Sequence, residues 1–153
     1  MIGAGGAIDT IKAVVNGIVL STTTSSGGST DAYSFTLAVN AIPSGNSLLV
    51  YLLTGGTAGT VWLSDGNNLS NVNLTLNTLT VGSNSTAAVS NANISAAKGS
   101  LTSTDIPYSV SGNNISVNLG VAFQTANNTN YTLNGNISTQ SANLTLTLSL
   151  IHI

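Results

Sequence analysis

Apolar and polar residues alternate with period two in short segments from residue 31 onward. Successive side chains of a β-strand point to opposite faces, so this pattern is typical of strands with one face on a core. One further segment, Leu48–Leu53, is apolar throughout and is typical of a strand buried on both faces. The alternating segments are Tyr33–Ala41, Val72–Leu76, Ile115–Phe123 and Leu144–Leu150.

Gly, Asn, Asp and Pro punctuate these segments, and Asn-Gly or Asp-Gly pairs suit two-residue hairpin turns because both central residues need positive φ. About eight to ten short strands joined in this way predict an all-β domain, a single β-sandwich of Ig-like or jelly-roll-like type. The predicted turns are Pro43–Asn46, Thr54–Gly56, Asp65-Gly66, Ser111–Asn113 and Asn134-Gly135.

Composition divides the chain into three zones. Residues 1–20 form an apolar tail, residues 21–30 hold no large apolar side chain and are typical of a flexible linker, and residues 31–153 form the β-sandwich head. The start of the tail lacks the basic residues and long apolar block of a signal peptide, so we expect a mature chain or an incomplete gene start.

The tail matches two patterns. A helical stripe is present, but the many Ile and Val residues near its end favour an extended strand. Such a strand would serve as a donor that completes the β head of a neighbouring copy by main-chain pairing, and ten linker residues reach about 33 Å when extended. An ordinary first strand of the chain's own sheet is the alternative. The predicted donor-strand residues are Ile11, Ala13, Val15, Gly17 and Val19.

Charge is nearly absent: charged residues are 4% of the chain, and 20 Asn, 21 Ser and 21 Thr take their place. A near-neutral surface favours self-association, so the expected partner is a second copy. With no Arg and only two Lys, nucleic acid is excluded as a partner. No apolar run is long enough for a membrane span, and with no Cys the redox compartment cannot be inferred.

The N-glycosylation motif Asn-x-Ser/Thr occurs nine times, always between residues 68 and 143. In the motifs at Asn73, Asn93, Asn114, Asn136 and Asn143 the middle residue is Leu or Ile. On a strand this arrangement directs the Asn and the hydroxyl to solvent and the apolar side chain to the core. We therefore expect N-linked sugars at several of these sites. The nine residues are Asn68, Asn73, Asn84, Asn93, Asn114, Asn127, Asn130, Asn136 and Asn143.

Catalytic, cofactor and metal sites are not predicted. The four Asp residues are scattered, so neither paired carboxylates nor a calcium loop is expected, and the only His is His152. Residues 148–153 are also what one reading frame of a common transposase sequencing adapter encodes, so we assign His152 no function. Trp62, Tyr51, Tyr108 and Tyr131 could line a sugar-binding face, although core packing is the usual role of scattered aromatics. An isopeptide through Lys98 would need a buried acid beside it.

With its tail, linker, uncharged β head and dense glycosylation motifs, the chain resembles the N-glycosylated subunits of archaeal extracellular filaments, the threads and bundling pili of hyperthermophiles. This resemblance implies a structural, non-enzymatic, extracellular homopolymer for adhesion or for cell–cell and biofilm contact. By the resemblance, the donor segment falls within residues 7–20. Two alternatives stay open. One is a type IV pilin-like subunit with a helical tail, although Lys12, Asn16 and Gly17 interrupt the apolar run that such a helix has. The other is a monomeric adhesin or carbohydrate-binding domain.

Overall fold

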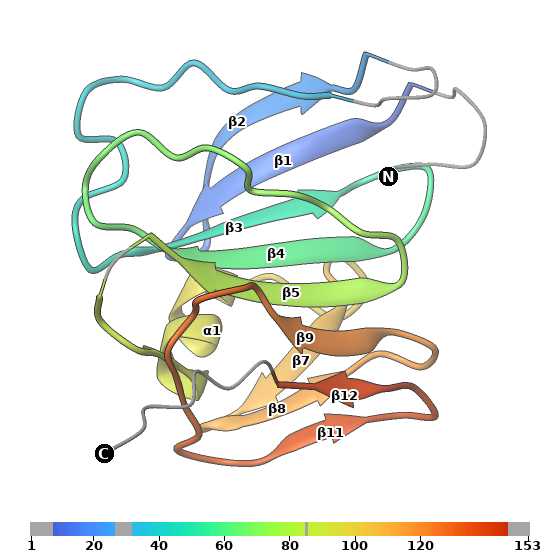
Figure 1. Ribbon diagram of the computed structural model, residues 1–153. Coiled ribbons are helices and arrows are strands. Elements are labelled where there is room, and N and C mark those ends of the chain that lie inside the picture. The colour runs from blue at the N-terminus through green and yellow to red at the C-terminus, as the bar shows by residue number, and fades with distance from the viewer. Residues whose placement is uncertain (1–7, 27–31, 85, 147–153) are drawn as a thin grey trace.

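The computed structural model describes residues 8–26, 32–84 and 86–146, which form a mostly β domain with one short helix (Figure 1). The all-β prediction is confirmed at this level. In chain order the elements are β1 (Thr10–Val15), β2 (Ile18–Thr24), β3 (Ser47–Leu52), β4 (Ala58–Leu63), β5 (Thr78–Ser83), β6 (Val89–Ser90), α1 (Asn91–Lys98), β7 (Tyr108–Ser111), β8 (Asn114–Val117), β9 (Ala122–Thr125), β10 (Tyr131–Thr132), β11 (Ile137–Thr139) and β12 (Leu144–Thr145).

A seven-stranded sheet in the order β12-β9-β5-β4-β3-β1-β2 forms the middle of the molecule. Its β2, β1, β3 and β4 are antiparallel neighbours, but β4, β5, β9 and β12 pair in parallel. Ig-like and jelly-roll sheets are antiparallel, so this pairing differs from the predicted one. Parallel neighbours need crossover connections, so Asp65-Gly66 lies in the crossover from β4 to β5 instead of in a hairpin. Asn134-Gly135 connects β10 to β11, which belong to two different small sheets.

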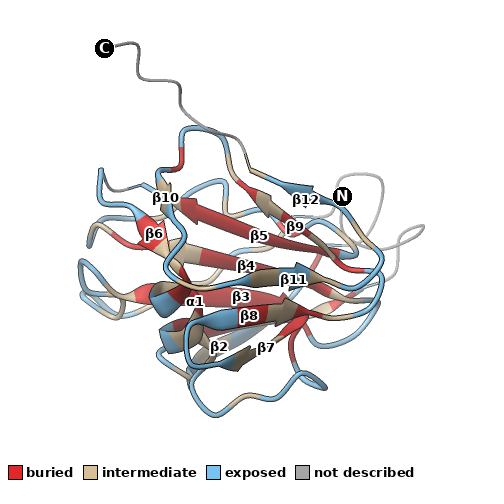
Figure 2. Ribbon diagram, turned by 90° about the horizontal axis from the view of Figure 1, so that it is seen from below, coloured by how far each residue is buried: buried red, intermediate tan, exposed pale blue. Residues whose placement is uncertain are grey.

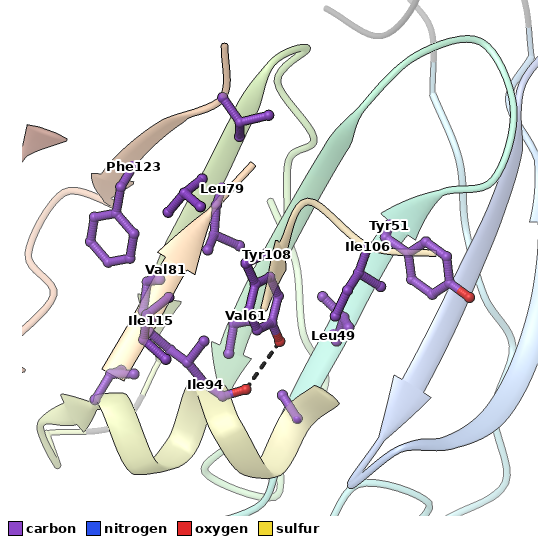
Figure 3. Packing of buried hydrophobic residues seen from close by; sticks show 14 of the residues in the cluster. Leu49, Tyr51, Val61, Leu79, Val81, Ile94, Ile106, Tyr108, Ile115 and Phe123 are labelled. Atoms are coloured by element: carbon purple, nitrogen blue, oxygen red, sulfur yellow. Dashed lines mark hydrogen bonds between the residues drawn. The ribbon is translucent and has the colours of Figure 1, made fainter. Parts of the chain in front are cut away.

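The face of this sheet toward α1 packs on a second layer made of α1 and the small sheet β11-β8-β7. Figure 3 shows this core, in which the Tyr108 hydroxyl donates a 3.0 Å hydrogen bond to the carbonyl of Ile94 in α1. Burial is greatest in β3, β4 and β5 (Figure 2). Every residue of β3 is buried, which confirms the prediction for Leu48–Leu52, whereas Leu53 follows the strand and is 47% exposed. The sheet contributes Val14, Leu49, Val61, Leu79 and Phe123 to this core.

The opposite face of the sheet carries a second core under two extended segments, residues 32–42 and 66–76. Both segments were predicted as strands, at Tyr33–Ala41 and at Val72–Leu76, and this prediction is wrong, since neither is paired in a sheet. The alternation nevertheless has its expected effect on packing: Tyr33 and Phe35 contact the second core, and Leu74 is fully buried in it. Of the predicted closing segment, Leu144–Thr145 form β12, and residues 147–150 lie outside the described residues.

The helix α1 was not expected. Its local signal is Ser90 at the N-cap with Asn93 three residues later, because the Asn93 side-chain oxygen accepts from the Ser90 main-chain N–H at 2.9 Å. The first helical residue, Asn91, is completely buried. Its amide donates to the carbonyls of Asn113 and Asn136, at 2.7 and 3.2 Å, and its oxygen accepts from Tyr131 at 2.6 Å. One side chain thus joins the helix to the starts of β8 and β11 and to β10.

Replacing Asn91 with Ala is expected to lower the free energy of unfolding by about 2 kcal/mol, because the three part-buried hydrogen bonds of its side chain are lost. Urea denaturation of the unglycosylated protein measures this change. Asn127, which is exposed in the turn after β9, offers the matched control. The variant Asn127→Ala removes the same kind of side chain from the surface and should change stability by less than about 0.5 kcal/mol. Equal effects of the two substitutions would show that the buried network does not stabilise the fold.

Candidate functional site

The N-terminal segment forms a β-hairpin within the chain's own sheet. β1 lies between β2 and β3, and Val15 pairs with Ile18 across the two-residue turn Asn16-Gly17, in which both residues have positive φ. Residues 10–15 and 18–24 are therefore strands, in agreement with the β-branched content. The Asn-Gly pair is a strong hairpin signal, and it divides residues 7–20, which were predicted as one donor segment, into two strands.

The predicted donor-strand residues consequently do not share one strand. Ile11, Ala13 and Val15 lie in β1 and are buried in the second core. Gly17 occupies the turn, and Val19 lies in β2 with 47% of its side chain exposed. The opposite face of β1 buries Val14 in the first core, so β1 is covered on both faces. Whether this strand enters a neighbouring copy stays a prediction.

The connection from the hairpin to the rest of the chain begins later than predicted. Ser21–Thr24 of the predicted linker belong to β2, and residues 27–30 lie outside the described residues, as do residues 1–7 of the tail. On either side of the connection the Ser26 main-chain N–H donates to the Ala32 carbonyl at 2.9 Å. The hairpin therefore joins the rest of the domain through a short Gly- and Ser-containing connection.

The tip of the hairpin contacts the end of α1. The Gly17 N–H donates to the Ala97 carbonyl at 3.2 Å, and a Cβ on Gly17 would lie 2.5 Å from the Cα of Gly99. Two glycines are needed here because the main chains cross with no room for a side chain. This contact anchors the hairpin on the side of the first core.

On the other face, a groove of about 1150 Å³ runs between the two extended segments, drawn in cyan and green in Figure 1. Ala13, Leu48 and Val50 contribute to its lining from the sheet, and none of its lining residues is charged. The Tyr33 hydroxyl donates to the Val72 carbonyl and links the two sides. The groove combines an apolar surface with many uncharged polar groups.

The main chain beside the groove is largely unpaired. Within the described residues, no main-chain N–H of residues 33–40 or 68–76 donates a hydrogen bond. Extended backbone normally satisfies these donors in a sheet ladder or with water. The layer over the second core is therefore open to a ligand that accepts main-chain hydrogen bonds.

The asparagines of the nine glycosylation motifs lie on the surface: all are exposed except Asn93, which is half-buried. The predicted geometry, with Asn exposed and the next residue turned toward a core, is found at Asn73, Asn114 and Asn136. It is wrong at Asn93, whose motif lies in α1 and whose side chain caps the helix. It is also wrong at Asn143, because Leu144 is 48% exposed on the two-residue strand β12.

Titratable groups do not converge on a reactive site in the described part of the chain. No three His, Cys, Asp or Glu side chains gather there. The main-chain and side-chain N–H groups of Asn67 hold the pKa of Asp65 below its usual value, and the hydroxyl and N–H of Thr102 do the same for Asp105. Both are surface turn contacts. Among the described residues Lys98 donates only to the Gly99 carbonyl, and His152 lies outside them.

The four aromatics proposed as a sugar-binding face do not share a face. Tyr51, Tyr108 and Tyr131 belong to the first core, and burial raises the pKa of each. Trp62 packs against the second core, on the other side of the sheet. Core packing accounts for all four.

Comparisons with protein-family models, with curated proteins and with solved structures give no significant match. Among the described residues, no helix has the length and hydropathy that a membrane span requires.

Proposed function

We propose that this protein is the structural subunit of an extracellular filament, and that copies join when the N-terminal hairpin of one copy takes the place of the equivalent hairpin in the next. The observation that carries the proposal is the position of β1. A segment at the N-terminal side of the chain, attached through a short connection, supplies an interior strand of the sheet.

Exchange of this hairpin between copies reproduces in the partner every contact made within one chain. Such an exchange is domain swapping, in which identical elements change places between copies. Because the donated hairpin and the accepting sheet edge are different surfaces, the contact is heterologous and extends into a filament if it does not close into a ring. β1 supplies Ile11, Ala13 and Val15 to one core and Val14 to the other.

The surface supports a polymer with sugars on it. Four Asp and two Lys are the only charged side chains of the chain, so copies repel one another little. N-linked glycans on the exposed motif asparagines would hydrate this surface without adding charge. Together with the resemblance to archaeal threads and bundling pili, these features favour a glycosylated surface fibre for adhesion or cell–cell contact, without enzymatic activity or cofactor.

Disulfide trapping tests the exchange, since the chain has no native cysteine. Ala13 in β1 pairs with Val50 in β3. Paired residues of antiparallel strands lie about 4.5–5.5 Å apart at Cα, within reach of a disulfide. We expect a mixture of the single variants Ala13→Cys and Val50→Cys to give disulfide-linked pairs on oxidation after assembly, as measured by non-reducing gel electrophoresis.

The control mixture combines Val50→Cys with Ala97→Cys, whose new thiol lies in α1 against the other core, and should give no linked pairs. The double variant Ala13→Cys/Val50→Cys tests the alternative, in which the hairpin stays in the sheet of its own chain. If it forms only an internal disulfide at every protein concentration, while the mixture of single variants stays unlinked, the protein is a monomeric domain and the filament proposal is wrong.

A further inference from the structure

Two of the glycosylation motifs lie in the wall of the groove. Asn68 and Asn73 belong to the extended segment 66–76, both are exposed, and both line the groove opposite Tyr33 and Phe35. Neither side-chain amide is engaged by another described residue, in contrast to that of Asn84, which donates to Asp65 at 2.6 Å. A sugar on either residue would begin at the edge of the groove.

The groove has the chemistry of a neutral saccharide site. Its lining combines apolar side chains with Asn, Ser and Thr, and it holds no charge that a charged ligand could pair with. Tyr33 and Phe35 pack edge to face, 5.7 Å apart between ring centroids. The unpaired N–H groups of residues 33–40 and 68–76 are donors for hydroxyl and acetamido oxygens. The volume, about 1150 Å³, is slightly above the usual range for small-ligand clefts.

We propose that the chain's own N-linked glycans, carried on Asn68 and Asn73, fold back into this groove and cover the second core. The inference rests on the proposed glycosylation and is independent of strand exchange. Attachment requires a lipid-phosphate-linked oligosaccharide: the asparagine Nδ2 bonds to the anomeric carbon, the carbon–oxygen bond to phosphate breaks, the lipid phosphate leaves with the electron pair, and the nitrogen loses one proton. Because the sugar is then tethered at the groove edge, its local concentration is high and weak contacts suffice to hold it.

Hydrogen–deuterium exchange on the full-length glycoprotein tests this. Peptides covering residues 33–40 and 68–76 are expected to exchange about tenfold more slowly in the glycosylated protein than in the variant Asn68→Gln/Asn73→Gln. Mass spectrometry of the same samples measures glycan occupancy at the two sites. The control variant Asn127→Gln/Asn143→Gln removes two exposed motifs that do not line the groove. It should leave the hydrogen–deuterium exchange rates of both segments unchanged.

Three results would overturn the inference. Asn68 and Asn73 could be unoccupied, or the exchange rates could be the same with and without their sugars. Alternatively, residues 33–40 and 68–76 of the variant Asn68→Gln/Asn73→Gln could be protected from hydrogen–deuterium exchange only in the polymer. In that case the polypeptide of a neighbouring copy occupies the groove. Electron microscopy of the Gln variant separates the two proposals, because strand exchange predicts that filaments still form without these sugars.

Discussion

A chain that begins at residue 27 is expected to stay unfolded in isolation and to fold when a peptide of residues 8–26 is added. Removing the hairpin exposes the edge of β3 and deletes Ile11, Val14 and Val15, each of which is buried. Burial of one large aliphatic side chain contributes about 1.5–3 kcal/mol, so the three together account for about 5–9 kcal/mol. The total stability of a domain is only about 5–15 kcal/mol.

Circular dichroism and the fluorescence of Trp62, the only tryptophan, would follow this complementation. Trp62 packs against the second core, which also contains Ile11 and Val15, so its environment reports the return of β1. A peptide carrying Val14→Asp is the matched control and should not restore the fold, because it would bury an unpaired carboxylate. A shortened chain that folds cooperatively without any peptide would show that β1 is dispensable, and hairpin exchange would then lose its basis.

Replacing Gly17 with Ala is expected to lower the free energy of unfolding by about 3 kcal/mol or more, with a fall in Tm of about 6–12 °C. Two costs combine at this position. Gly17 has a φ of +77°, which is unfavourable for a residue with a Cβ, and that Cβ would lie 2.5 Å from the Gly99 Cα. Relief requires the hairpin tip to move away from α1, with loss of the hydrogen bond to Ala97.

Gly112 separates the two costs. It lies in the hairpin turn between β7 and β8 with a φ of +59°, but a Cβ there would meet nothing within 4 Å. Gly112→Ala should therefore cost only the backbone strain, about 1–2 kcal/mol. Thermal and urea denaturation of both variants measure the difference. Equal losses in the two variants would mean that the contact between the hairpin tip and α1 does not hold the hairpin in place.

Local patterns predicted the elements better than their arrangement. The apolar run identifies β3, because burial is a property of neighbouring residues. The alternation of Ile115–Phe123 was predicted as one segment, but it falls on two strands of different sheets, β8 and β9, because residues 118–121 lie in no strand and Leu119 is 73% exposed. The turn at Ser111–Asn113 was correct, since Ser111 pairs with Asn114. Segments 32–42 and 66–76 have the same alternation and are extended, yet no ladder forms. Pairing depends on a neighbouring strand, and sequence period carries no information about one.

The same distinction between local sequence patterns and tertiary arrangement applies to the candidate site. The uncharged surface, the nine glycosylation motifs and the tendency of the N-terminal segment to form strands follow from the sequence alone, because they depend on which residues are present and in what order. Tertiary structure alone determined that β1 lies inside the chain's own sheet, that β4, β5, β9 and β12 are parallel, and that Asn68 and Asn73 share a groove with Tyr33. These relations join residues far apart in the chain, and the burial of two cores on opposite faces of one sheet brings them together.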